Sequence, residues 1–152
     1  MKLLLDTNIL IDYYARRRPF FQEVVKLRVA AMFGDVELWA AIQSFSDVEC
    51  ALRKAIPVEE LRDMMRRSMD FLKVAAPTAA DLSDALGSGW PDLEDRLVAR
   101  CAERVKADRI ITRDLDGFAS SPIKAQTPLE YLAWLEEEQG IVYDELDLSG
   151  GI

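Results

Sequence analysis

The chain has 152 residues, half of them apolar, and a formal net charge of −8 at pH 7. This length predicts one domain with a proper hydrophobic core, and no apolar run is long enough to span a membrane. With no histidine and only two cysteines, the composition excludes Cys/His zinc sites and Ser-His-Asp or Cys-His catalysis. The opening residues are too soon charged for a signal peptide, so we expect a cytoplasmic protein.

The negative charge is concentrated at one end of the chain. Residues 125–152 hold seven acidic residues and no basic one, so the preceding part is nearly neutral. We therefore expect a folded domain over residues 1–138 and a loosely held acidic tail over residues 139–152. Cys50 and Cys101 form no Cys-x-x-Cys pair, and we expect both to be buried thiols with a packing role.

Short apolar segments alternate with longer segments of helical periodicity. The predicted strands cover residues 2–5, 36–40, 71–75, 109–112 and 123–126, with residues 141–143 as a further candidate edge strand. The predicted helices cover residues 8–14, 20–33, 44–54, 57–69, 78–86, 91–106 and 127–138. Thr78 and Thr127 are the predicted N-caps of two helices. The alternation predicts an α/β fold in which helices flank a central parallel sheet of four or five strands.

Four aspartates occur where a predicted strand ends or a helix begins. Asp6 and Asp114 follow strands, whereas Asp47 and Asp95 lie in the first turns of helices. In an open α/β sheet these places face the same edge, so we expect the four carboxylates to converge. Each aspartate also has an ordinary structural explanation as a turn or capping residue, and Asp47 has the spacing to cap back to Ser44.

Four adjacent carboxylates repel one another unless a cation binds between them. Carboxylate oxygens are the ligands that Mg²⁺ and Mn²⁺ prefer, and these ions suit phosphodiester hydrolysis. The sequence therefore predicts a divalent-metal site built from the four aspartates. Nearby acids leave alternatives open: Glu49 in place of Asp47, Asp116 in place of or beside Asp114, and Asp92 near the site.

Arginines recur at every fourth position on the helix that begins near Asp95, at Arg96, Arg100 and Arg104. Such a stripe binds phosphates in some proteins and in others is a solvated helix face closed by ion pairs, here for example Arg100 with Glu103. Further basic clusters occur at residues 16–18 and at Arg62, Arg66 and Arg67.

Four blocks of the sequence together resemble the PIN domain, the metal-dependent ribonuclease module of VapC-type toxins. The opening Leu3-Leu4-Leu5-Asp6-Thr7-Asn8-Ile9-Leu10 is similar to the family's strand-Asp-Thr-Asn start. Ser44-Phe45-Ser46-Asp47-Val48 resembles its second block, in which the acid is often Glu. Residues 92–99 resemble the third block, with Asp95 at the metal-binding position. Residues 110–118 resemble the fourth block. The resemblance spans roughly residues 1–135, including the start of the final helix.

The resemblance implies an endoribonuclease that hydrolyses RNA phosphodiester bonds with Mg²⁺ or Mn²⁺. It implies that the metal is held by Asp6, Asp47, Asp95 and Asp114. It implies supporting roles for Thr7, Asn8, Ser44 and Asp116. We also predict contacts with RNA for Arg96, Arg100 and Arg113. The implied partners are the RNA substrate, a second copy of the chain in a homodimer and, for a toxin, an antitoxin protein, with no membrane partner.

Two other classes of function are compatible with parts of this pattern. A non-catalytic PIN-like scaffold would bind RNA or protein, but it would not need all four acids, which are present here. A phosphatase or receiver-like protein would use Asp6 as a phosphate acceptor, but Asp6 lacks the Asp-x-Asp pattern of an aspartyl-phosphate phosphatase. The ribonuclease hypothesis accounts for more of the residues.

Overall fold

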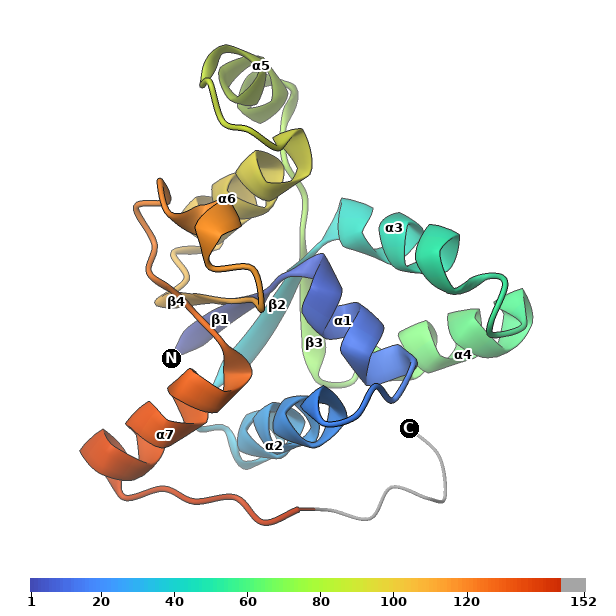
Figure 1. The fold of residues 1–152 in the computed structure, drawn as a ribbon, viewed down its shortest axis with the longest axis vertical. Helices are drawn as coiled ribbons and strands as arrows, with labels where there is room; N and C mark the ends of the chain where they lie inside the picture. Colours follow the sequence, from blue (N-terminus) through green and yellow to red (C-terminus); the bar gives the residue numbers. More distant parts are fainter. Residues whose placement is uncertain (146–152) are drawn as a thin grey trace.

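The computed structural model describes residues 1–145 and contains a parallel sheet with the strand order β3-β2-β1-β4-β5 (Figure 1). The strands are β1 (Lys2–Leu5), β2 (Glu37–Ala41), β3 (Leu72–Ala75), β4 (Arg109–Ile111) and β5 (Ala125–Gln126). Each pair of neighbouring strands is parallel, as the alternation of strands and helices requires. The predicted α/β fold with a five-stranded parallel sheet is confirmed.

The helices connect successive strands and cover both faces of the sheet. They are α1 (Thr7–Tyr14), α2 (Phe20–Phe33), α3 (Ile42–Leu52), α4 (Val58–Ser68), α5 (Ala79–Gly87), α6 (Leu93–Val105), the 3₁₀ turn η1 (Asp116–Phe118) and α7 (Pro128–Gln139). The predicted caps Thr78 and Thr127 both form capping boxes. Within residues 1–145, no helix has the length and apolar character needed to cross a bilayer.

Two helix starts differ from the prediction by two residues. Helix α3 begins at Ile42, directly after β2, so Ser44 is inside the helix rather than its N-cap. Helix α6 begins at Leu93 rather than at residue 91, because the Asp92 side chain accepts a hydrogen bond from Asp95 N and caps the helix there. Asp95 therefore lies in the first turn of α6 as predicted, whereas Asp47 lies in the middle of α3 and not in its first turn, because that helix begins two residues earlier than expected.

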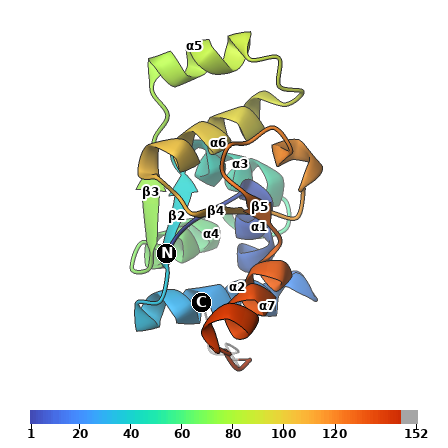
Figure 2. The ribbon, with the colours of Figure 1, turned by 90° about the vertical axis from the view of Figure 1, so that its left-hand side faces the viewer.

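Alternate residues of β1 point to opposite faces of the sheet, and each face has its own core. Leu3 and Leu5 pack with α1, α2 and α7, whereas Leu4 packs with α6. Helix α5 lies on the outer side of α6, away from the sheet (Figure 2). The central strand is buried on both sides, so the residue that follows it, Asp6, has a fixed position.

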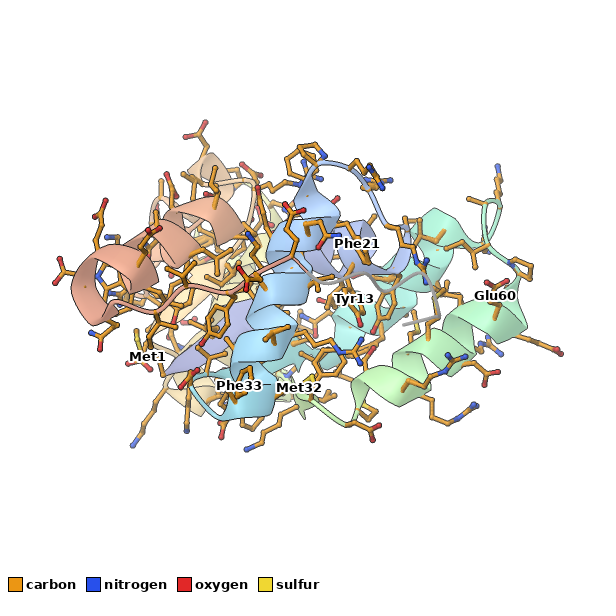
Figure 3. The ribbon with its side chains drawn as sticks, turned by 90° about the horizontal axis from the view of Figure 1, so that it is seen from below. Met1, Tyr13, Phe21, Met32, Phe33 and Glu60 are labelled. Atoms are coloured by element: carbon orange, nitrogen blue, oxygen red, sulfur yellow. The ribbon has the colours of Figure 1, made fainter. Side chains whose placement is uncertain are left out.

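Aromatic side chains fill the core between α1 and α2. Tyr13 and Phe21 lie next to one another there, with ring centroids 6.0 Å apart (Figure 3). The hydroxyl of Tyr14, on the same helix, lies 2.7 Å from Ser68 Oγ on α4. These contacts hold α1, whose N-cap is Asp6, against α2 and α4.

Two local predictions are wrong, and one falls partly outside the described residues. Cys101 is buried as expected, but Cys50 is exposed because it lies on the outer side of α3. Residues 141–143 form no strand; instead Tyr143 is 9% exposed and its hydroxyl donates to Asp35. The chain beyond α7 therefore packs against the domain as far as Tyr143, while residues 146–152 of the predicted tail lie outside the described residues.

Candidate active site

Asp6 lies at the carboxyl end of the central strand and caps the first helix. Its backbone N–H donates to Ile111 O at 2.9 Å, which extends the pairing of β1 with β4. Its carboxylate accepts hydrogen bonds from Thr7 N (2.7 Å), Asn8 Nδ2 (2.8 Å) and Thr112 Oγ1 (2.8 Å). The residue is only 4% exposed, and this burial raises its pKa to about 6 despite the three donors.

Asp95 lies in the first turn of α6 and shares the electrostatic environment of Asp6. Burial raises its pKa to about 7, with further contributions from the negative charges of Asp6, Asp92, Asp114 and Glu94. The end of β1, the start of α6 and the loop after β4 therefore bring their carboxylates together, as the sequence predicted.

Asp114 follows β4 and lies opposite Asp95 across Gly117. Its N–H donates to Thr112 Oγ1 at 2.9 Å, and its Oδ1 accepts a hydrogen bond from Gly117 N at 3.1 Å. A Cβ atom on Gly117 would stand 2.5 Å from Asp95 Oδ2 and 2.8 Å from Asp114 Oδ2. The absence of a side chain at this position therefore lets the two carboxylates approach the Gly117 backbone, and each other, closely.

Asp47 lies near Glu94, and Glu94 in turn lies beside Thr7 and the other acids. Glu94 is a residue that the sequence analysis missed. Glu94 Oε1 accepts a hydrogen bond from Thr7 Oγ1 at 2.6 Å, and the same hydroxyl lies 2.8 Å from Ser44 Oγ. Burial raises the pKa of Glu94, and the adjacent charge of Asp47 adds to this rise. The sequence did contain a signal for Glu94, because it lies in the same first helical turn as Asp95.

The structure distinguishes between the acids that the sequence left as alternatives. Glu49 is held on α3 by a bidentate pair with Arg62 of α4, with both N–O distances at 2.7 Å. Asp116 is exposed at the start of η1, and within residues 1–145 no hydrogen bond or ion pair joins its side chain to the other acids. The geometry therefore favours Asp47 over Glu49 and Asp114 over Asp116.

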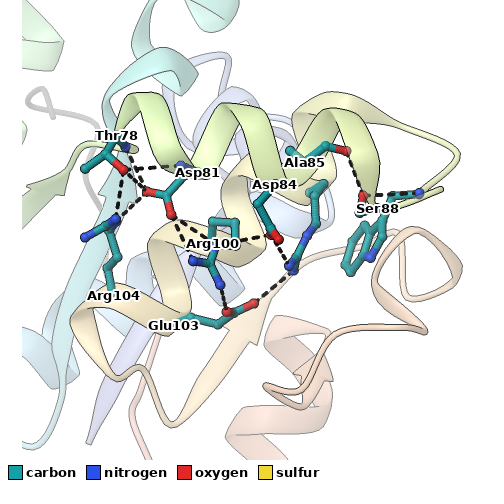
Figure 4. A network of polar contacts seen from close by, with 10 residues as sticks. Thr78, Asp81, Asp84, Ala85, Ser88, Arg100, Glu103 and Arg104 are labelled. Carbon is teal, nitrogen blue, oxygen red and sulfur yellow. Dashed lines mark hydrogen bonds and ion pairs between the residues drawn. The ribbon is translucent and has the colours of Figure 1, made fainter.

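The arginine stripe of α6 is occupied by ion pairs with carboxylates of the same chain (Figure 4). Asp81 of α5 accepts hydrogen bonds from both Arg100 and Arg104. Glu103 pairs with Arg96 at 2.9 Å and with Arg100 on the preceding turn. The ion-paired helix face is therefore the structural explanation of the stripe, and RNA contacts by Arg96 and Arg100 stay a prediction.

Arg113, the remaining predicted RNA-binding residue, also has a partner inside the chain. Its Nε and Nη2 donate to the two carboxylate oxygens of Asp12 at 2.6 and 3.1 Å, and its guanidinium lies 4.3 Å from the ring centroid of Phe20. Asp12 is fully buried on α1. The pair ties the loop that carries Asp114 to the first helix, and RNA contact by Arg113 likewise stays a prediction.

The clustered carboxylates have no cationic partner. Within residues 1–145, no lysine or arginine forms an ion pair with Asp6, Asp47, Glu94, Asp95 or Asp114. Nor do any three acidic or cysteine side chains in this part of the chain already surround one point as metal ligands would. The carboxylate oxygens of Asp95 and Asp114, which converge beside Gly117, nevertheless fit a hard divalent cation, onto which the side chains would close.

Comparisons with known proteins agree with this architecture. A family model described as PIN domain matches residues 2–116. VapBC-1 from nontypeable Haemophilus influenzae has a TM-score of 0.65 at 19% identity, over 85% of this chain and 99% of that chain. VapBC2 from Rickettsia felis, bound to a DNA fragment from their promoter, has a TM-score of 0.62 at 15% identity, over 84% and 98%. FitAcB from Neisseria gonorrhoeae has a TM-score of 0.54 at 15% identity, over 84% and 98%. No curated protein sequence gives a significant match.

Proposed function

Because this chain belongs to the PIN domain family, we propose that it is a divalent-metal-dependent endoribonuclease that hydrolyses RNA phosphodiester bonds. One observation carries the proposal: separate parts of the chain bring acidic side chains together with no ion-paired lysine or arginine in residues 1–145. Asp6, Asp95 and Asp114 would hold Mg²⁺ or Mn²⁺, and Asp47 would contribute beside Glu94. When bound, the ion supplies Lewis-acid stabilisation of the negative charge that develops on the phosphodiester.

The residues around the acids fix their orientation. Thr112 Oγ1 donates to Asp6 Oδ2 and accepts from Asp114 N, so one hydroxyl is hydrogen-bonded to two of the acidic residues. Thr7 links Asp6 to a further acid, because its N–H donates to Asp6 and its hydroxyl donates to Glu94. Carboxylates held in this way lose less conformational entropy when they bind a cation or substrate. These contacts support the role that the resemblance implies for Thr7, Asn8 and Ser44, and we propose the same role for Thr112.

The decisive experiment compares Asp6→Asn with wild type on single-stranded RNA. We expect wild type to cleave RNA with Mn²⁺ or Mg²⁺ and to stop in EDTA, and we expect Asp6→Asn to lose at least about 100-fold in rate. Asp70→Asn is the matched control, because Asp70 is exposed just before β3, at the opposite edge of the sheet. Cleavage that persists both in EDTA and in Asp6→Asn would refute the proposal. RNA binding with neither cleavage nor calorimetric Mn²⁺ binding would instead support the non-catalytic scaffold.

We further propose that the protein is the toxin of a toxin–antitoxin pair and acts as a homodimer. The support is the likeness in fold to VapBC and FitAB structures, whose names denote two-component complexes. If a small gene lies next to the gene for this chain, co-expression with its product should yield a stable complex and relieve any growth arrest caused by this chain alone. Sedimentation of the isolated protein tests the dimer separately, and a monomer at all concentrations would exclude it.

A further inference from the structure

The loop between α1 and α2 presents three consecutive exposed arginines, Arg16, Arg17 and Arg18, here called the arginine loop. Its backbone is held by hydrogen bonds rather than left open. Arg17 N–H donates to Asp12 O at 3.0 Å, and Arg17 O accepts from Phe21 N at 2.8 Å. The three side chains therefore project from a fixed support, so a ligand that bound them would not have to order the loop.

Most of the positive charge on the arginine loop has no counter-charge among residues 1–145. Within residues 1–145, neither Arg16 nor Arg18 forms an ion pair. Arg17 lies 4.0 Å from Asp12 Oδ1, but that carboxylate already accepts two hydrogen bonds from Arg113. This sets the loop apart from the α6 stripe, whose guanidinium groups are occupied by Asp81, Asp84 and Glu103. Glu23 of α2 is a further acid near Asp12, and its pKa is raised by burial and by the negative charge of Asp12.

The arginine loop is joined to the segment that carries Asp114. Buried Asp12 contacts both Arg17 and Arg113, and the Arg113 guanidinium stacks on Phe20, the residue with which α2 begins. Asp12 lies six residues after Asp6 on α1, which is about 9 Å along the helix axis. The arginine loop itself begins after the C-cap Ala15, about 14 Å from Asp6 along the helix axis, a distance that an extended single strand of a few nucleotides can span.

We propose that the arginine loop binds phosphate groups of single-stranded RNA beside the site of cleavage. The inference rests on the proposed ribonuclease function. A carboxylate cluster repels a polyanion, so productive binding needs a cationic surface next to it, and phosphate contacts supply most of the sequence-independent affinity of nucleic-acid-binding proteins. The arginine loop combines a link to the Asp114 segment through Asp12 with two guanidinium groups, those of Arg16 and Arg18, that have no carboxylate partner within residues 1–145.

The test measures binding of a short fluorescein-labelled oligouridine by anisotropy in EDTA, where no metal-dependent cleavage occurs. The variant Arg17→Gln/Arg18→Gln removes two charges from the loop, and Lys106→Gln/Lys124→Gln removes two from exposed residues at the amino ends of β4 and β5. We expect the arginine variant to bind about tenfold more weakly and to lower the slope of log affinity against log salt by about 1.4. The lysine variant should bind as wild type does, and equal melting temperatures would exclude unfolding.

Each result bears on one proposal. Wild-type affinity and salt slope in Arg17→Gln/Arg18→Gln would overturn the RNA surface, even if that variant lost affinity for an acidic peptide such as polyglutamate. An equal loss in the lysine variant would also overturn it, because the effect would then be one of net charge. If wild type cleaves RNA but the loop substitutions leave binding unchanged, only this inference fails. If wild type binds through the loop but never cleaves, only the nuclease proposal fails.

Discussion

The negative charge of Asp95 is unfavourable in the metal-free fold, so its removal should stabilise the protein. The folded-state pKa of about 7 exceeds the ordinary value of 3.8. The carboxylate therefore destabilises the native state above about pH 7, and this effect disappears as the pH falls below about 4. We expect Asp95→Asn to raise the free energy of unfolding by ~1 kcal/mol at about pH 8 and to have no effect near about pH 4. Urea unfolding at both pH values measures this, and a variant less stable than wild type at the higher pH would contradict it.

Asp12 should be among the acids whose loss destabilises the fold. Its side chain is fully buried, whereas that of its bidentate partner Arg113 is 32% exposed. We expect Asp12→Asn to lower the free energy of unfolding by about 2 kcal/mol, because it leaves Arg113 half-buried without a counter-charge. Glu49→Gln is the control, since it breaks an equally bidentate pair at the surface, where solvent screens the charges and the loss should be clearly smaller. Similar losses in the two variants would show that burial of Asp12 does not matter.

At the scale of single residues, the sequence predicted acids that follow strands better than acids on helices. Asp6 and Asp114 were identifiable because the carboxyl ends of parallel strands meet at one edge. Glu94 was missed because the pairing of its side chain with Thr7 depends on how α6 packs beside α1. The exposure of Cys50 likewise depends on which side of α3 faces the core, and apolar composition alone does not decide this.

At the scale of elements, α5 should depend on Asp81 for its attachment to α6. Asp81 is fully buried, and its hydrogen bond from Arg104, with others from Thr78 and Arg100, holds its pKa well below the usual range. Because the folded-state pKa is lowered, this stabilisation is complete above the ordinary pKa and is lost only as the pH falls through the folded-state value. At neutral pH we expect Asp81→Asn to speed amide hydrogen exchange in α5 by at least about tenfold.

The control for Asp81 is its neighbour on the same helix. Asp84→Asn removes the charge of a side chain that is 52% exposed but pairs with Arg96 and Arg100 of the same network. Exchange in α5 should change little in this variant. Equal acceleration in the two variants would mean that net charge, rather than the buried position of Asp81, holds α5 in place.

The elements themselves were predicted well because their signals are local. Period, capping residues and breaks placed every strand and helix within a few residues, and the capping box at Thr127 was read correctly. The ion pairs between the α6 arginines and α5 could not be predicted from local sequence. The acidic partners on α5 become neighbours of these arginines only when α5 packs against α6. The basic stripe alone was therefore compatible both with ion pairs inside the chain and with contacts to phosphate groups.

At the scale of the whole molecule, a chain with a net charge of −8 and a carboxylate cluster should gain stability from divalent cations. We expect Mn²⁺ at about 100 times its dissociation constant to raise the free energy of unfolding by about 2.7 kcal/mol. Thermal melts with Mn²⁺ and with EDTA measure the shift. It should be lost in Asp114→Asn and kept in Asp70→Asn, and a shift of equal size in both would indicate nonspecific binding to the acidic surface.

The strand order belongs to this largest scale and lies beyond what periodicity can specify. Alternating strands and helices imply right-handed parallel crossovers, but they allow several orders of five strands. Placing β1 at the centre, between β2 and β4, is what sets Asp6 beside Thr112 and the segment leading to Asp114. Convergence of the acids was therefore predictable as a possibility of the fold class, whereas their actual neighbours required the packed structure.

Gly117 offers a way to silence the protein without altering any acid. Its φ lies outside the left-handed region, so an alanine there would meet the oxygens of Asp95 and Asp114 rather than backbone strain. The added methyl group would thus displace the carboxylate oxygens that are proposed to bind the cation. Such an inert version, with its outer surface intact, would be a suitable bait for trapping RNA or protein complexes that the active form destroys or releases.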